Sequence, residues 1–365
     1  MPRLRLSVCR HLWRPLVAAT LLVHAPSVVR AQTLSRVSLD SVGAIDLFGG
    51  QGTTGNPDAS VDISSVIRLG NGWSAHLRPW FFKSTSDGST WSRELYQAAI
   101  RYERPGATSV RLDTGFIALP VGLGMLDMRA DINPLVQPHL SYYMPLMTFD
   151  RGAPAVGPIT ASYPFGSNVT VSSSRWDVRT AVVAAAPTRR YTVNSAEPNP
   201  AATPVVVTGG GVTPVTGLRI GGSLAAGRYA TPGELADPAG PARRLTMWTA
   251  EGEYAFAYTK VSAEFTRERF DHGASRDTSS TWYLQGMQTL TPRWFAAARH
   301  EAISAPPFAV LGPDRLSFRT TEAAIGYRLT PELTLRSSFV AMRWYTAKKF
   351  DQRVGAQIVW SRRWW

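Results

Sequence analysis

Few residues in this sequence have the types and spacing needed for catalysis. Nucleophilic catalysis requires a base close to a serine or cysteine, and a third group that orients the base. After residue 31 the chain contains no cysteine and four histidines, His76, His139, His272 and His300, and His139 lies two positions from Ser141. No two histidines have the spacing of metal ligands. The sequence therefore predicts no catalytic residue, no metal site and no cofactor.

Charged residues show a clearer pattern, because they recur at every second position of short segments. Ladders of charge on the wall of a wide pore discriminate among ions and small solutes. We expect a pore-lining role for Arg78, Arg101, Arg111, Asp113, Arg175, Asp177, Arg179, Arg219, Glu251, Glu253, Glu264, Arg299, Glu322 and Arg336. Glu301, Arg328 and Arg353 follow the same pattern. Arginines concentrate in the earlier segments and carboxylates in the later ones, which predicts a field across the bore.

The segments that carry these charges are predicted to be β-strands. Apolar and polar residues alternate with period two in segments of about ten residues. From Trp176 to Ala184, for example, Arg175, Asp177 and Arg179 occupy the second face. Aromatic residues on the apolar faces fall toward segment ends, as expected at water-lipid interfaces. Beyond residue 32 no apolar run reaches the roughly 18 residues that a membrane-spanning helix needs. The alternation therefore predicts an all-β protein without membrane-spanning helices.

Connections of two lengths alternate along the chain. Short turns are predicted at 70–72, 104–106, 172–174 and near 257, and at Thr213-Pro214, Thr291-Pro292 and Thr330-Pro331. Longer polar connections are predicted at 49–58, 83–91, 117–158, 187–202, 230–243, 271–279, 303–315 and 346–350. With a strand at about 203–212, seven turns and eight loops join sixteen strands. This pattern is typical of a transmembrane antiparallel β-barrel, which closes on itself to satisfy its backbone.

The first 31 residues have the composition of a secretory signal peptide. Four arginines precede the apolar stretch from Leu16 to Val23, and Val29-Arg30-Ala31 provides a cleavage site. We expect cleavage after Ala31 and a barrel formed by residues 32–365. The chain of 365 residues carries 39 Lys and Arg against 26 Asp and Glu. Five of these arginines and no acid lie in the signal segment, so the formal charge of +13 falls to +8, which weakens the case for nucleic acid as a partner.

Three stretches resemble the phosphate-selective branch of the sixteen-stranded outer-membrane porins. The first runs from Asp113 to Phe116 and on through Leu119-Pro120-Val121-Gly122-Leu123-Gly124; the others are Tyr283-Leu284-Gln285-Gly286 with Leu290 to Phe295, and Gly326 to Leu329. The aromatic end, Trp364-Trp365, resembles the signature that the barrel assembly machinery reads. Phosphate-selective members are known for basic lumens, whereas this chain has four lysines, so phosphate selectivity is not expected.

The longest predicted connection, Ile117 to Pro158, follows the fifth strand. In the porins that the chain resembles, the third external loop lies at this point and folds toward the lumen, where it narrows the channel. The resemblance thus implies a constriction formed by Asp127, Arg129, Asp131, His139, Asp150 and Arg151. Arg129, Asp131 and Arg151 would lie nearest its narrowest point. Alternatively, these three pair with one another and hold the loop against the wall.

These expectations describe a bacterial outer-membrane porin that passes small hydrophilic solutes or ions by diffusion, with a weak preference for anions. Its partners would be membrane lipid, the assembly machinery and, from the resemblance, two further copies in a homotrimer. The alternatives are a secreted or outer-membrane β-protein acting as an adhesin, or a barrel enzyme of the lipase or protease type.

Overall fold

Sixteen β-strands account for most of the chain in a computed structural model that describes residues 36–50, 53–84, 90–192, 199–273 and 275–364. The strands are β1 (Val37–Gly50), β2 (Thr53–Gly70), β3 (Trp73–Lys83), β4 (Trp91–Arg104), β5 (Ser109–Phe116), β6 (Phe165–Ser172), β7 (Trp176–Val183), β8 (Val205–Val215), β9 (Leu218–Ala230), β10 (Arg243–Phe256), β11 (Thr259–Asp271), β12 (Arg276–Thr289), β13 (Trp294–Ala305), β14 (Leu316–Arg328), β15 (Leu333–Arg343) and β16 (Asp351–Arg363).

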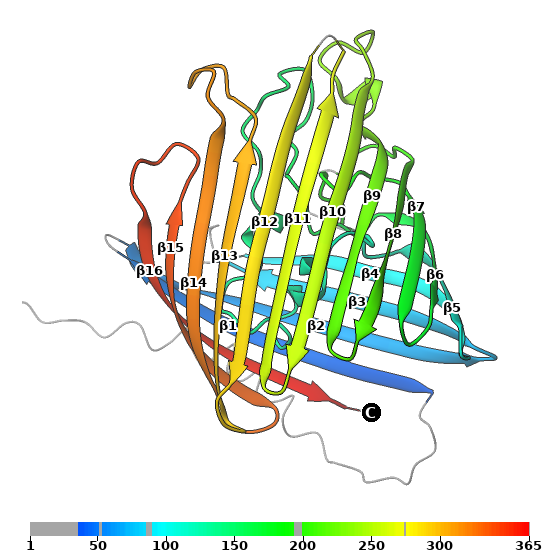
Figure 1. Cartoon of the computed structure of the whole chain (residues 1–365), viewed down its shortest axis with the longest axis vertical. Helices are drawn as coiled ribbons and strands as arrows, with labels where there is room; N and C mark the ends of the chain where they lie inside the picture. The colour runs from blue at the N-terminus through cyan, green and yellow to red at the C-terminus, as the bar shows by residue number, and fades with distance from the viewer. Residues whose placement is uncertain (1–35, 51–52, 85–89, 193–198, 274, 365) are drawn as a thin grey trace, which may run out of the picture. The chain divides into compact units, whose positions relative to one another are not determined.

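The strands form one closed barrel (Figure 1). Each strand pairs antiparallel with its neighbours in sequence, and β1 pairs with β16 in a register that runs from Asp40 opposite Arg363 to Gly50 opposite Arg353. Closure gives every strand two partners, so no strand edge is left with a row of unpaired backbone groups. The prediction of an all-β, sixteen-stranded antiparallel barrel is confirmed.

Alternation along the strands separates an apolar outer face from an inner face that is largely polar. In β7 the outward side chains include Trp176, Val178 and Val182, all at least 40% exposed, whereas the inner face carries Asp177 and Arg179, followed by the buried Ala181 and Val183. Aromatic pairs such as Trp73 with Tyr102 lie on the outer face beside the short turns. An apolar surface of this extent is unusual for a protein surrounded by water.

Three predicted connections differ from the structure. Residues 49–58 belong mostly to strands, because β1 and β2 pair up to Gly50 opposite Thr53. Residues 271–279 are largely strand as well, with β11 ending at Asp271 and β12 beginning at Arg276. Thr213-Pro214 lies within the end of β8, and the chain reverses at Gly217, whose φ of +87° favours glycine.

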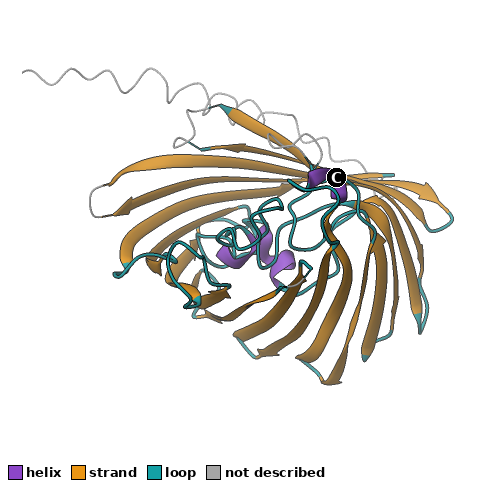
Figure 2. Ribbon diagram, turned by 90° about the horizontal axis from the view of Figure 1, so that it is seen from above, coloured by secondary structure: helices purple, strands orange, loops and turns teal. Residues whose placement is uncertain are grey.

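Among the described residues, helical structure is limited to three short 3-10 segments, η2 (Gly124–Met128), η3 (Leu140–Tyr142) and η4 (Pro232–Glu234). None of the helices in the described part of the chain is long and apolar enough to cross a bilayer. Seen from above, the strands form a ring that surrounds loops and short helices (Figure 2).

Candidate functional site

The long connection between β5 and β6, residues 117–164, is held by carboxylates on strands far from it in sequence. Its backbone N-H groups donate to Glu264 on β11, Glu301 on β13 and Glu322 on β14. These contacts join residues between 140 and 186 positions apart. All three glutamates lie on inner faces and are buried. Charge-assisted bonds to backbone N-H groups are stronger than neutral ones, so the three carboxylates fix the path of the connection.

Glu264 binds the start of the connection. Its carboxylate accepts hydrogen bonds from the backbone N-H of Leu123 at 2.6 Å and of Gly124 at 3.1 Å, and from the hydroxyl of Tyr142 at 3.0 Å. Gly122 makes the close approach possible, because a Cβ there would lie 2.4 Å from Glu264 Oε1. Its φ of +70° also lies in the left-handed region that favours glycine.

Glu301 and Glu322 receive the middle of the connection. Glu301 accepts from the backbone N-H and the hydroxyl of Ser141, each at 3.0 Å. Glu322 accepts from the N-H groups of Val136 at 3.0 Å and Gln137 at 3.1 Å. The wall therefore supplies acceptors for donors that no regular secondary structure of the connection would satisfy.

Two arginines supply the matching donors. Arg299 on β13 donates to the carbonyl oxygens of Gln137 at 2.8 Å and Pro138 at 2.6 Å, and its Nε lies 2.7 Å from Glu301. Arg336 on β15 donates to the carbonyl oxygen of Ala130 at 2.8 Å. Donors and acceptors on β11, β13, β14 and β15 thus hold the connection against this part of the inner wall.

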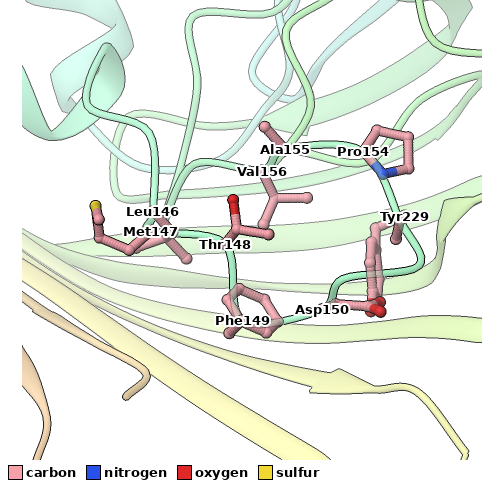
Figure 3. A pocket seen from close by; sticks show the side chains of 10 residues that line it. Leu146, Met147, Thr148, Phe149, Asp150, Pro154, Ala155, Val156 and Tyr229 are labelled. Atoms are coloured by element: carbon pink, nitrogen blue, oxygen red, sulfur yellow. The ribbon is translucent and has the colours of Figure 1, made fainter. Parts of the chain in front are cut away.

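An apolar layer packs between the rest of the connection and the inner wall. Leu146 and Val156 belong to the largest buried cluster, together with Tyr229 and Phe270 from the wall. Figure 3 shows Leu146, Val156 and Tyr229 around one small pocket in this layer. Asp150 lies at the edge of this layer, where its carboxylate accepts from Tyr229 Oη at 2.7 Å and pairs with Arg243 at 2.7 Å. These two partners outweigh the effect of burial and lower the pKa of Asp150.

His139 is enclosed at the centre of the anchored connection. Its side chain is fully buried, its ring centroid lies 4.3 Å from that of Tyr283, and its Nε2 lies 3.8 Å from Asp127 Oδ2, beyond hydrogen-bond distance. Neither ring nitrogen has a hydrogen-bond partner among the described residues. Burial, followed by the nearby charge of Arg299, lowers the pKa of His139, so its neutral form is favoured.

Arginines dominate the opposite part of the inner wall. Arg78 on β3 binds Asp62 of β2 at 2.6 Å. Arg101 and Arg111, on β4 and β5, share Asp113 at 2.6 and 3.0 Å. The register causes this sharing, since Arg101 stands opposite Asp113 and Arg111 lies two residues before it on the same face. Glu103 stands opposite Arg111 in the same register, so this face holds two arginines and two carboxylates, of which Asp113 is buried and Glu103 is exposed.

A second group lies on β7, β9 and β10. Glu251 binds Arg179 at 3.0 Å and Arg219 at 2.6 Å, and Arg219 also binds Asp177 at 3.0 Å. Gly211 leaves room for it, because a Cβ there would lie 2.7 Å from the guanidinium carbon of Arg219. Gly211 thus gives the arginine room against the wall, and the β8–β9 register continues through Gly209, Gly210 and Gly211 without a bulge.

Within these pairs the arginine is consistently the more exposed partner. The side chain of Arg111 is 41% exposed and that of Asp113 is 6% exposed. For Arg219 and Glu251 the values are 25% and 0%, and for Arg78 and Asp62 they are 18% and 8%. Solvent therefore meets guanidinium groups above the carboxylates of Asp62, Asp113 and Glu251, whereas Asp177 is as exposed as its partner Arg219.

The structure corrects part of the pore-lining prediction. Four of those residues are buried against the connection and anchor it, namely Glu264, Arg299, Glu322 and Arg336. Glu251 is buried between its two arginines. Partly or largely exposed inner positions are Arg78, Arg101, Arg111, Arg175, Asp177, Arg179, Arg219 and Glu253, the last paired with Lys260 at 2.8 Å. Asp113 is buried beneath its two arginines.

The predicted constriction residues also divide. Asp127, His139 and Asp150 are buried in contacts within the anchored connection or with the wall. Arg151 is exposed. Arg129 and Asp131 remain partly exposed and pair with each other at 2.6 Å. This pairing agrees with the alternative interpretation for those two residues, and Arg151 does not join it in any described contact.

The histidine and serine singled out in the sequence, His139 and Ser141, form no hydrogen bond with each other. Ser141 Oγ donates to Glu301, not to His139. In the β11–β12 turn, however, His272 lies between Ser275, 3.0 Å from its Nδ1, and Asp277, 2.8 Å from its Nε2. His272 and Ser275 lie in the short connection between β11 and β12, and Asp277 is the second residue of β12, where such local bonds commonly stabilise a chain reversal.

Several residues of the site do not stand out in the sequence. Asp62 is one of them, although Asp58, Ser60, Asp62 and Ser64 alternate regularly, because the predicted loop 49–58 interrupts their segment. Gln285 and Gln357, which bind Asp127 and Arg336, carry no charge that would single them out. Inner aromatic residues of β3 and β4 were also missed.

Neither a family model nor a curated protein matches the sequence. Solved structures do match. OmpF of Salmonella typhi, in complex with daunomycin, superimposes with a TM-score of 0.62 at 8% identity, over 89% of this chain and 97% of that one. OprB of Pseudomonas putida gives 0.59 at 12% identity over 89% and 94%. An anion-selective porin from Comamonas acidovorans gives 0.53 at 11% identity over 90% and 99%.

The fold is that of the outer-membrane porins. In this porin fold the connection 117–164 follows the fifth strand, and its anchors lie on the strands from β11 to β16.

Proposed function

We propose that the chain forms a water-filled channel in a bacterial outer membrane, through which small hydrophilic solutes and ions diffuse, with a weak preference for anions. The apolar outer face suits contact with acyl chains, and the closed ladder satisfies the backbone in hydrocarbon. On the inner face, polar side chains of β2–β10 remain partly exposed, so that wall is reached by solvent.

The single observation that carries the proposal is the exposure of guanidinium groups above buried carboxylates. The guanidinium groups of Arg101 and Arg111 lie on the solvent side of the buried Asp113, and the side chain of Arg111 is 41% exposed. A positive potential at a solvated wall raises the local concentration of anions. Buried Glu264, Glu301 and Glu322 contribute less, because the anchored connection separates them from solvent.

We place the solute path between the arginine-bearing wall and the exposed edge of the connection at Arg129 and Asp131. Their side chains are 22% and 20% exposed. In a sixteen-stranded barrel a segment held inside the lumen narrows the passage, which sets an upper size for the solute.

The reversal potential of the channel in a planar bilayer, under a gradient of potassium chloride, tests this proposal. Arg111→Gln removes one exposed positive charge while Arg101 still pairs with Asp113, so the barrel should fold normally. We expect the reversal potential to shift toward cations. Lys348→Gln removes the same charge from an exposed position in the β15–β16 loop and should have a smaller effect. Equal shifts for both variants would contradict the assignment of the wall, and absence of conductance in the natural sequence would contradict the channel.

The outer-membrane location and the export of the chain are part of the same proposal. Residues 1–31 lie outside the described residues, and we propose that they direct export and are removed after Ala31. The intact mass of protein recovered from outer membranes checks this cleavage. We propose no catalysed reaction and no nucleic-acid partner.

A homotrimer and recognition by the barrel assembly machinery rest on the resemblance to porins. Chemical crosslinking in membranes, followed by electrophoresis, distinguishes three copies from one. The likeness to the phosphate-selective branch rests on short motifs, and phosphate selectivity is not proposed.

A further inference from the structure

Four aromatic rings form a continuous stack on the inner side of β3 and β4. Phe82 stacks on Trp80 with centroids 5.1 Å apart, Trp80 on Tyr96 at 5.0 Å, and Tyr96 on Tyr163 at 4.6 Å. The three interplanar angles are 6°, 18° and 9°. We call these four residues the aromatic column. The aromatic column takes no part in the contacts that anchor the connection to β11–β16. Three of its rings lie on β3 and β4, and Tyr163 lies at the end of the connection.

A register shift in the β3–β4 ladder produces the column. Arg78 stands opposite Gln97, but Pro79 stands opposite Leu95, so Tyr96 is the additional residue of a β-bulge. Bulges redirect a side chain, and here Tyr96 reaches the inner side, where alternation already places Trp80 and Phe82. Tyr163 comes from the end of the long connection.

The column has a buried part and an accessible part. Tyr96 and Tyr163 are only 4% and 2% exposed. Trp80 and Phe82, toward the β3–β4 loop, remain half-buried, and both face the interior of the barrel. The accessible part of the column is therefore aromatic surface on the proposed solute path.

Two ion pairs flank the column. Arg78 lies over the ring of Tyr96, with its guanidinium carbon 5.6 Å from the centroid, and pairs with Asp62. Arg190 donates to both oxygens of Glu94 at 2.8 Å. The side chain of Arg190 is 43% exposed and that of Glu94 is 6% exposed. In both pairs the arginine is the more exposed partner, so the groups beside the aromatic surface that face solvent are cationic.

We propose that the aromatic column, with Arg78 and Arg190, binds small aromatic carboxylates as they pass through the channel. This inference rests on the proposed function and names a solute class for it. An aromatic ring stacks on indole and phenyl faces, and a carboxylate pairs with guanidinium groups. A neutral sugar would also stack but would leave the exposed cations unused, and an aromatic amine would be repelled by them.

Block of the ion current by added solutes tests the proposal in planar bilayers. Benzoate, cyclohexanecarboxylate, acetate, benzylammonium and glucose are each titrated into potassium chloride, and the half-blocking concentration is measured. We expect benzoate to block at the lowest concentration. Trp80→Leu should raise the value for benzoate about three- to tenfold, as expected for one lost aromatic pair. Arg190→Gln should raise it as well, while leaving the ratio of benzoate to cyclohexanecarboxylate nearly unchanged.

Phe81→Leu is the matched control, because Phe81 lies between Trp80 and Phe82 on the opposite face of β3. It should leave all half-blocking concentrations unchanged. Equal block by benzoate and cyclohexanecarboxylate, or stronger block by glucose, would overturn the proposal while the channel itself stands.

Calorimetric titration of the detergent-solubilised protein with benzoate separates this proposal from the channel. Binding that is weakened by Trp80→Leu supports the site even if no conductance is found. Lack of binding together with normal conductance removes the site and leaves the channel.

Discussion

Arg299 Nε lies 2.7 Å from Glu301 Oε1, and both side chains are almost completely buried between β13 and the connection 117–164. The pair is surrounded by further partners, since Arg299 also donates to two carbonyl oxygens of the connection and Glu301 accepts from Ser141. A buried ion pair of this kind fixes one arrangement, because each charge is costly to leave alone.

Removal of the cation should therefore destabilise the protein strongly. Arg299→Met leaves Glu301 and Glu322 buried without their counter-charge, and we expect the free energy of unfolding to fall by about 3 to 5 kcal/mol. Guanidinium unfolding in lipid vesicles, followed by tryptophan fluorescence, measures the change. Arg276→Met breaks an exposed pair with Asp271 and should cost less than about 1 kcal/mol. Similar losses in the two variants would contradict the anchoring role of Arg299.

Neutralising Glu264 should loosen the start of the connection without unfolding the barrel. Glu264→Gln weakens the bonds from Leu123 and Gly124, at a cost of about 1 to 3 kcal/mol. Limited proteolysis should then cut within 117–164 faster than in the natural sequence. Glu253→Gln, which affects a half-exposed pair with Lys260, serves as the reference and should be cut at the natural rate.

A methyl group at position 122 should produce the same loosening by a steric route. Gly122→Ala places Cβ 2.4 Å from Glu264 Oε1 and also forces alanine into positive φ. Gly312→Ala shares the positive φ, of +111°, but its Cβ would meet nothing within 4 Å. Both variants should lose about 1 to 2 kcal/mol from the backbone alone. Only Gly122→Ala should lose more stability than this and become sensitive to protease. Equal thermal midpoints for the two variants would show that the Glu264 side chain moves aside without cost.

Acid should weaken the anchored connection through His139. Its folded-state pKa lies below the ordinary 6.5, so the folded protein binds this proton less readily than the unfolded chain. The contribution of neutral His139 is present above about pH 6.5 and is lost as the pH falls from there through the folded-state pKa. Asp127 and Glu301 attract the imidazolium and Arg299 repels it, but burial is the largest effect.

Comparison with His139→Leu isolates this contribution. The thermal midpoint of the natural sequence should fall more between pH 7.5 and pH 5 than that of the variant. Parallel pH profiles would assign the acid sensitivity to the carboxylates instead.

The Ser275, His272 and Asp277 arrangement should have no hydrolytic role. We expect purified protein to release no nitrophenol from short nitrophenyl esters above the level found with Ser275→Ala. Activity that disappears in Ser275→Ala and also in His272→Gln would instead make this turn an active site. Thermal midpoints should fall slightly in both variants, because each loses a bond that stabilises the turn.

The sequence predicted the barrel well and the inner wall only in part, for physical reasons. Strand alternation is local, so positions such as Val178 and Asp177 reveal their faces from neighbours alone. Whether an inward charge meets water or protein depends on the path of another segment. Glu264 and Glu253 are equivalent by pattern, yet one is buried beneath a connection 140 residues away and the other is half-exposed.

Backbone pairing explains the remaining differences. Residues 49–58 are rich in Gly, Asn and Pro and have low strand propensity, but the ladder between β1 and β2 continues through them. Tyr96 could not be placed either, because the bulge that turns it inward arises from a mismatch between two strands and leaves no mark in one of them.

The anchoring of residues 117–164 on β11, β13, β14 and β15 also bears on how the chain folds. The backbone contacts of Leu123, Gly124 and Val136 with the wall join residues 140 or more positions apart, so they form only after β11 to β14 are in place. Such distant contacts slow folding, because a large loop must close before they contribute. We therefore expect docking of the interior segment to be a late event, so that the proposed channel would pass through an immature stage with a wider and less selective bore.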